Sequence, residues 1–211
     1  MSHNAGVLHS EPQSGAREAL AGRLLERILA REARVGVIGL GYVGLPLVRA
    51  TVEAGFRVLG FDIDAEKVAQ LNAGRSYIRH ISSEMIAAVR EGGHFEATDD
   101  FALVREVDVL LACVPTPLTR HREPDLSFVV GTAEAIAPYL RPGQLFVLES
   151  TTYPGTTEEV VKPILARSGV EVFIAYSPER EDPGNIDFGT SAIPKVVGGD
   201  GEDALRLAQA F

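Results

Sequence analysis

Residues 34–44 read RVGVIGLGYVG and decide the fold of this chain. The first five form an apolar run with the length of a short buried strand. Three glycines follow with the spacing G-x-G-x-x-G, namely Gly39, Gly41 and Gly44. In a turn that binds a dinucleotide, the first glycine permits the tight turn, the second lets the backbone approach a pyrophosphate, and the third lets the next helix pack closely. The stretch therefore predicts a phosphate-binding turn.

The residues after this turn complete a βαβ unit. Residues 42–54 have the pattern of a helix that ends at Gly55, and residues 56–61 form a second apolar run that leads to Asp62. The start of the helix would offer free N–H groups and the positive end of its dipole to phosphates. The Asp62 carboxylate can accept hydrogen bonds from an adenosine ribose and would repel a 2′-phosphate. Because all these parts occur together within about 30 residues, we predict a site for NAD rather than NADP.

Composition narrows the class of protein. The chain has 211 residues, 45% of them hydrophobic, which suits one or two domains with a substantial core. The net charge is −9 and no cluster of Lys and Arg occurs, so neither nucleic acid nor a membrane is expected as a partner. A single cysteine, Cys113, fits a reducing cytoplasm. The histidines lack the spacing of metal ligands, and we predict no metal site.

Apolar runs and helical patterns alternate along most of the chain. We expect a disordered tail over residues 1–16, an amphipathic helix over 17–33 and a dinucleotide-binding domain over 34–211. The alternation predicts an α/β fold of the Rossmann type, a doubly wound parallel sheet with helices on both faces. The predicted strands cover 34–38, 56–61, 95–97, 107–114, 145–148 and 170–175, and the helices after the second strand cover 65–72, 82–90, 99–104, 127–139 and 155–167.

Polar residues gather where the predicted strands end. The fourth strand leads into residues 113–117, CVPTP, and the fifth into residues 149–155, ESTTYPG. The sixth leads into residues 176–185, YSPEREDPGN. Ligands of open α/β sheets bind outside the carboxyl ends of the strands, so these three segments are expected to surround the site.

Six motifs follow one another along the chain: GLGYVGLPL at 39–47, LNAG at 71–74, VPTP at 114–117, STT at 150–152, SPER at 177–180 and IPKVVGG at 193–199. Together they resemble the N-terminal domain of the UDP-glucose/GDP-mannose dehydrogenase family, and most of all its UDP-N-acetylglucosamine 6-dehydrogenase branch. The resemblance extends from about Arg34 to the end of the chain. Several motifs at successive strand ends are far more specific than any one of them.

The resemblance implies an enzyme that oxidises the C6 alcohol of a UDP-sugar to a carboxylate with two NAD and one water. The family route passes through an aldehyde and a thioester on a cysteine. By the matching motifs, Asp62 and Lys67 would hold the adenosine ribose, Thr116 would lie along the dinucleotide, and Thr151 would contact the nicotinamide side and position a water. Glu179 would be the general base for thioester hydrolysis. The implied cofactor-binding residues are Gly39, Gly41, Tyr42, Val43, Gly44, Asp62, Ile63, Lys67, Val114, Pro115, Thr116 and Thr151.

Structural roles compete with these assignments. A hydroxyl such as Thr151 can also cap the helix that follows it. Glu179 could be a solvated carboxylate paired with Arg180. Lys195 could contact substrate or another subunit, but an ordinary surface lysine is favoured. Two positions depart from relatives. Many relatives have a proline two residues after the threonine that matches Thr151, whereas here Pro154 lies three residues after it. Pro183 stands where many UDP-glucose enzymes have a second glutamate.

Cys113 is not expected to be the family's nucleophile, because it ends an apolar strand where free cysteine is usually buried. In the family the nucleophilic cysteine follows a long helix that joins the two halves of the enzyme. We therefore expect this chain to be the cofactor-binding half of a longer enzyme. The whole enzyme would be a homo-oligomer, whereas this half could be a monomer.

Other classes of protein remain compatible with the residues. A two-domain dehydrogenase of the 3-hydroxyacid or 6-phosphogluconate type would share the same first half and make no acid through a thioester. A non-catalytic module that senses NAD would bind the cofactor and respond to no UDP-sugar. A methyltransferase is a weaker alternative, because an acid after the second strand also suits the ribose of S-adenosylmethionine.

Overall fold

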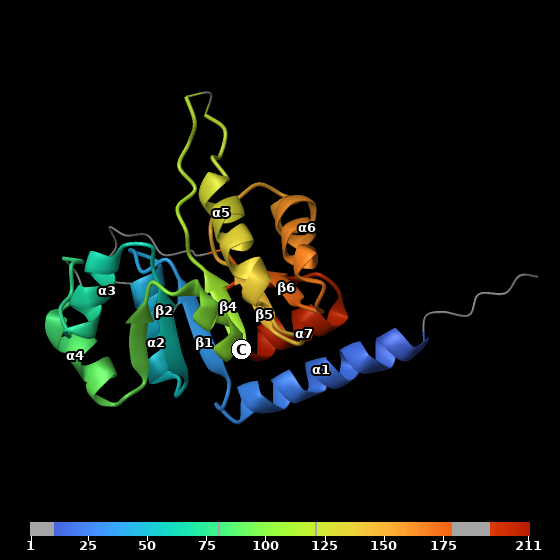
Figure 1. Cartoon of the computed structure of the whole chain (residues 1–211), viewed down its shortest axis with the longest axis horizontal. Helices are drawn as coiled ribbons and strands as arrows, with labels where there is room; N and C mark the ends of the chain where they lie inside the picture. The colour runs from blue at the N-terminus through green and yellow to red at the C-terminus, as the bar shows by residue number, and fades with distance from the viewer. Residues whose placement is uncertain (1–10, 80, 121, 179–194) are drawn as a thin grey trace, which may run out of the picture.

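The computed structural model describes residues 11–79, 81–120, 122–178 and 195–211. Its centre is a seven-stranded sheet with the order β3-β2-β1-β4-β5-β6-β7 (Figure 1). The strands are β1 (Arg34–Ile38), β2 (Arg57–Phe61), β3 (Phe95–Thr98), β4 (Val109–Ala112), β5 (Leu145–Leu148), β6 (Phe173–Tyr176) and β7 (Gly198–Gly199).

The order of the strands reverses between β1 and β4, which lie side by side with Val35 opposite Val109. The first six strands are parallel, so the predicted doubly wound sheet is confirmed. The expectation of an entirely parallel sheet is corrected at one edge, where β7 pairs with β6 in the antiparallel sense. This edge strand consists of two glycines, so it carries no apolar pattern that could have predicted it.

Helices cover both faces of the sheet (Figure 1). One layer contains α1 (Glu11–Leu29), α2 (Gly44–Glu53), α3 (Ala65–Asn72), α4 (Ser83–Glu91) and α7 (Glu202–Ala210). The opposite layer contains the 3-10 turn Phe101–Glu106, α5 (Ser127–Ile136) and α6 (Lys162–Leu165).

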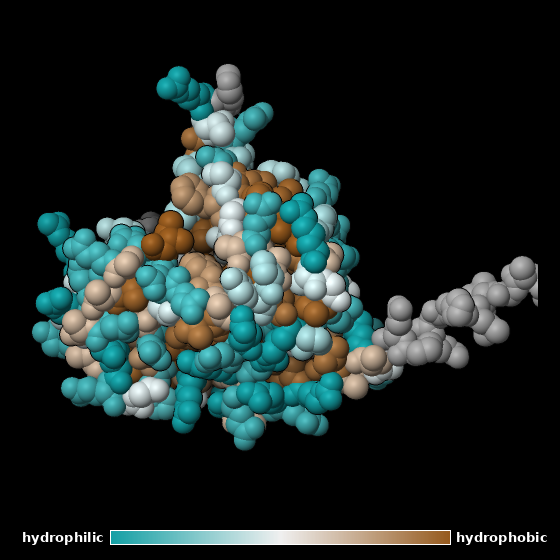
Figure 2. Space-filling model, viewed as in Figure 1, coloured by the Kyte–Doolittle hydropathy of each residue, from teal (hydrophilic) through white to brown (hydrophobic). Residues whose placement is uncertain are grey.

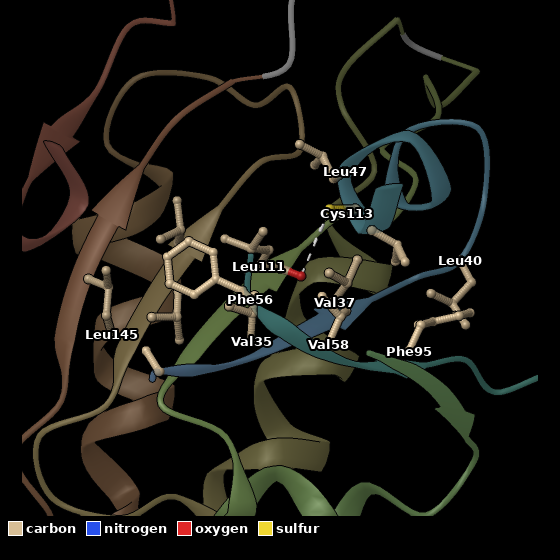
Figure 3. Close-up of a cluster of buried hydrophobic side chains, with 14 of the residues drawn as sticks. Val35, Val37, Leu40, Leu47, Phe56, Val58, Phe95, Leu111, Cys113 and Leu145 are labelled. Carbon is tan, nitrogen blue, oxygen red and sulfur yellow. Dashed lines mark hydrogen bonds between the residues drawn. The ribbon is translucent and has the colours of Figure 1, made fainter. Parts of the chain in front are cut away.

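Alternate residues of the central strands supply the two cores. Val35 and Val37 of β1 point to the first layer, whereas Ile38 belongs to the second. Figure 3 shows the first core, in which Phe56 and Leu145 pack with the valines of β1 and β2. Because both faces are covered, β1 and β4 are almost wholly apolar and place their polar neighbours only at their ends.

Several boundaries differ from the predictions. Helix α1 begins at Glu11 instead of Arg17 and ends at Leu29, so residues 11–16, expected in the disordered tail, are helical. The helix predicted over 155–167 is divided into a π-helical turn (Thr156–Val161), α6 and a 3-10 turn (Ala166–Ser168). Pro163 has no N–H to donate to a preceding carbonyl, which accounts for a change of helical hydrogen bonding in this segment.

The other strand and helix predictions hold within a few residues. The bounds of β1, β5 and α3 agree fully with the predicted ranges. The predicted helix over 127–139 ends as α5 at Ile136 and continues as a 3-10 turn (Ala137–Tyr139). Among the residues that the structure describes, no helix combines the length and apolar character needed to span a membrane.

Candidate cofactor site

A cavity of about 540 Å³ opens at the carboxyl ends of β1, β4 and β5, where the strand order reverses. Figure 2 shows hydrophobic surface exposed on this side of the molecule, between α3 and α5. Every residue that we predict to bind the cofactor lines the cavity, except Gly44. The cavity is lined by Ile38, Gly39, Gly41, Tyr42, Val43, Phe61, Asp62, Ile63, Lys67, Phe101, Cys113, Val114, Pro115, Thr116, Phe128, Thr132, Glu149, Ser150 and Thr151.

The glycine turn forms one wall of this cavity. Gly39 has φ +89°, and a Cβ there would lie 2.6 Å from the carbonyl oxygen of Cys113. A Cβ on Gly44 would lie 1.9 Å from the carbonyl oxygen of Gly39, so Gly44 permits α2 to pack directly on the turn. A Cβ on Gly41 would meet no atom within 4 Å, which leaves open space beside this backbone. The three glycines thus have the three different surroundings that a dinucleotide-binding turn requires.

The start of α2 faces the same turn. The helix begins at Gly44 without a side-chain cap, and no acidic residue lies in its first turn. The N–H groups of Leu45 and Leu47 donate to the carbonyl oxygens of Gly41 and Val43, so it is the positive end of the helix dipole that favours a bound anion at this position. The glycine turn and α2 together therefore fit the pyrophosphate of a dinucleotide.

Asp62 lies at the end of β2 and is 7% exposed. Its Oδ2 accepts a hydrogen bond from the N–H of Leu40 at 2.9 Å, and its Oδ1 accepts one from the N–H of Asp64 at 3.0 Å. Each carboxylate oxygen can accept a further hydrogen bond, so Asp62 can hold the glycine turn and still bind a ribose hydroxyl. Lys67 also lines the cavity, and its Nζ lies 4.0 Å from Asp64 Oδ2.

Hydrogen bonds join the loops that follow β4 and β5. The Thr116 hydroxyl donates to the carbonyl oxygen of Thr151 at 2.7 Å. The Ser150 hydroxyl donates to the carbonyl oxygen of Val114 at 2.7 Å and accepts from the N–H of Val114 at 3.1 Å. Ser150 is buried, whereas Thr151 is exposed at the cavity wall. These bonds hold the two predicted contact segments against each other.

The alternative prediction, that Thr151 caps the helix that follows it, is wrong. Gly155 occupies the N-cap position of the helical segment that follows, and no side chain caps it. Thr151 therefore lines the cavity without serving the helix. Glu179, the predicted general base, and Arg180 lie outside the described residues.

Glu149 and Lys195 form an ion pair that sequence reasoning missed. Nζ of Lys195 lies 2.6 Å from Oε2 of Glu149, whose side chain is only 5% exposed. Glu149 lines the cavity next to Ser150. Lys195 is therefore exposed, as a surface lysine would be, and also pairs with a buried carboxylate of the cavity wall. The partners are 46 residues apart, and no local pattern could have indicated their contact.

Further residues line the cavity that no sequence pattern predicts. Phe101 comes from the 3-10 turn after β3, and Phe128 and Thr132 come from α5. Cys113 is 8% exposed at the end of β4, as expected for a small buried residue. Within the described residues, no group of three or more potential metal-ligating side chains is present.

The family model and the curated relatives that match this chain agree on one family. A family model described as the NAD binding domain of the UDP-glucose/GDP-mannose dehydrogenase family matches residues 33–211. Among curated proteins, the UDP-N-acetyl-D-glucosamine 6-dehydrogenase of Pseudomonas aeruginosa is 35% identical over 188 residues, which is 86% of this chain and 43% of that protein. The UDP-N-acetyl-D-mannosamine dehydrogenase of Methanococcus aeolicus is 34% identical over 83% of this chain and 40% of that protein.

Solved structures agree with the sequence relatives. The NDP-N-acetyl-D-galactosaminuronic acid dehydrogenase of Methanosarcina mazei Go1 superposes with a TM-score of 0.77 and 32% identity. That match covers 88% of this chain and 43% of the other. The chain spans less than half the length of these relatives. Because the family model matches most of the chain, the chain belongs to the UDP-glucose/GDP-mannose dehydrogenase family as its NAD-binding domain.

Proposed function

We propose that the cavity at the ends of β1, β4 and β5 binds NAD. The observation that carries the proposal is the glycine cradle, in which Gly44 leaves no room for a side chain while Gly41 opens into the cavity. The uncapped start of α2 would hold the pyrophosphate. Asp62 and Lys67 would hold the adenosine ribose, and Asp62 would disfavour the 2′-phosphate of NADP.

The remaining contacts belong to the other end of the cofactor. Thr116 and Thr151 come from loops that are hydrogen-bonded to each other, so they would form one continuous contact along the dinucleotide. Val114 and Pro115 would supply apolar contact beside them. Bound NAD would supply the hydride acceptor, while the residues of this chain would orient it toward the loop after β5.

We infer that the whole protein is an NAD-dependent UDP-sugar 6-dehydrogenase and that this chain is its cofactor-binding half. The named relatives at 34–35% identity act on UDP-N-acetylated hexosamines, which makes such a sugar the favoured substrate class. In this proposal Thr151 orients a water, because an unaided hydroxyl is a weak base, and Glu179 accepts its proton during thioester hydrolysis. A cytoplasmic location and a homo-oligomeric whole protein belong to the same proposal.

The test uses the full-length gene product with NAD and UDP-N-acetylglucosamine. We expect two NADH and one sugar acid for each sugar consumed. A dehydrogenase of the 3-hydroxyacid or 6-phosphogluconate type would form one NADH for each substrate molecule and would produce no acid by way of a thioester. NAD binding without turnover of any UDP-sugar would instead favour a sensing module.

Thr151→Ala tests the role of the predicted threonine. We expect kcat to fall by 10²-fold or more, because a positioned water and the nicotinamide contact would both be disturbed. Thr157→Ala is the matched control, since Thr157 lies in the π-helical turn and does not line the cavity. Equal kcat values for Thr151→Ala and the control would contradict the assignment.

A further inference from the structure

Leu40, between the first two glycines of the turn, is held through both of its backbone polar groups. Its N–H donates to Asp62 Oδ2 at 2.9 Å, and its carbonyl oxygen accepts a hydrogen bond from the Tyr77 hydroxyl. The Leu40 side chain is fully buried against Gly60, where an added Cβ would come within 2.8 Å of it. One residue of the turn is therefore fixed on three sides.

Tyr77 makes its contact from outside the cavity. It lies in the loop between α3 and α4 and is not among the residues that line the cavity. Ser76 fixes this loop, because its N–H donates to Ser83 Oγ at 3.0 Å and its Oγ accepts from the N–H of Ile78 at 3.1 Å. Tyr77 is half-buried, and the adjacent Ile78 is 4% exposed. The hydroxyl is thus presented by a loop that is held by hydrogen bonds of its own.

The surroundings of Tyr77 keep its hydroxyl a donor. Burial raises the pKa of the phenol well above its usual value of about 10, and the carboxylates of Asp62 and Asp64 raise it further. The phenol is therefore protonated at any pH at which the protein would work. Its ring also contacts Lys67, whose Nζ lies 5.8 Å from the ring centroid.

The direction of the Leu40 carbonyl matters for an anionic ligand. A phosphate-binding turn has to direct N–H groups at the ligand, and a carbonyl oxygen turned the same way would repel it. Without the phenol, the Leu40 carbonyl would lose its partner and the peptide between Leu40 and Gly41 could rotate, because glycine accepts a wide range of backbone angles. The open space beside Gly41 leaves room for such a rotation.

We propose that Tyr77 is a positioning residue for pyrophosphate binding, which acts by holding the Leu40 carbonyl away from the cavity. This inference rests on the proposed NAD site and adds to it a residue that does not touch the ligand. The Tyr77 ring links this action to the ribose end of the site, because it also supports Lys67.

Tyr77→Phe tests the inference, because it removes only the hydroxyl and retains the ring beneath Lys67. We expect the Kd values for NAD and for ADP to rise about ten-fold in calorimetric titrations of the chain. The Kd for adenosine, measured by NMR titration, should change less than two-fold because adenosine has no phosphate. Tyr139→Phe is the matched control, since this half-buried ring contacts Arg105 away from the cavity, and it should leave all three affinities unchanged.

Two results would overturn the inference. Affinities of Tyr77→Phe for NAD and ADP within two-fold of the wild type would show that the phenol does not position the turn. A loss for adenosine as large as the loss for ADP would show a general structural role instead. Absence of NAD and ADP binding by the wild-type chain would overturn the proposed function and this inference together.

Discussion

At the scale of single residues, the glycine turn is where sequence and structure agree most closely. Gly39 has a positive φ and Gly44 a close backbone approach, and both demands favour glycine, so these two positions can be predicted from the sequence. At Gly41 an added Cβ would meet no atom, so its glycine is explained by the space it leaves beside the backbone. Glu149 and Lys195 could not be predicted, because an ion pair between residues 46 apart depends on the completed sheet.

Gly44→Ala should be among the most damaging single substitutions in the chain. Its Cβ would lie 1.9 Å from a backbone oxygen, which cannot move without shifting the turn or α2. We expect the free energy of unfolding in urea to fall by about 3 kcal/mol.

Gly131→Ala is the control for this experiment. Gly131 lies inside α5, where a Cβ meets nothing within 4 Å. This substitution should raise the free energy of unfolding by about 0.5–1 kcal/mol through helix propensity. Equal effects of the two substitutions would contradict the close packing of α2 on the turn.

At the scale of elements, the position of α1 depends on both apolar and charged contacts. Leu24 and Ile28, which belong to the predicted apolar face of this amphipathic helix, are buried together with Ala21, whereas Leu29 is 65% exposed. The pattern could not predict that Asp108, at 4% exposure, would hold the helix to the sheet. Asp108 Oδ2 accepts from Arg27 Nη2 at 2.8 Å and from the N–H of Arg34 at 2.8 Å, and its Oδ1 accepts from Arg141.

Asp108→Ala should therefore destabilise the attachment of α1. Two arginines and one backbone N–H would lose a buried acceptor, and we expect a loss of about 3 kcal/mol in the free energy of unfolding. Amide hydrogen exchange in α1 should become faster than in α5.

Glu106→Ala provides the comparison. Glu106 forms a 2.6 Å ion pair with Arg34, but its side chain is 46% exposed. Exposed pairs contribute little, so the loss should be at most about 1 kcal/mol. A loss for Asp108→Ala no larger than this, with unchanged exchange in α1, would refute the role of Asp108.

At the scale of the whole molecule, the alternation of strands and helices is sufficient to predict the doubly wound sheet and the edge of the sheet at which the cavity opens. The reversal of strand order between β1 and β4 brings the glycine turn, Asp62 and the loops after β4 and β5 to one cavity. The helical bounds near Pro163 and the edge strand β7 were less predictable. The first depends on the missing N–H of Pro163 and the second on pairing with β6, and neither is indicated by an apolar pattern.

The most direct test of the proposed NAD site is a calorimetric titration of the chain with NAD and with NADP. We expect one binding site for NAD, at least ten-fold weaker affinity for NADP, and a loss of this preference in Asp62→Ala, because the carboxylate would accept hydrogen bonds from the ribose hydroxyls and would repel a 2′-phosphate. Binding of neither dinucleotide, or equal affinity for both in the wild-type chain, would contradict the account.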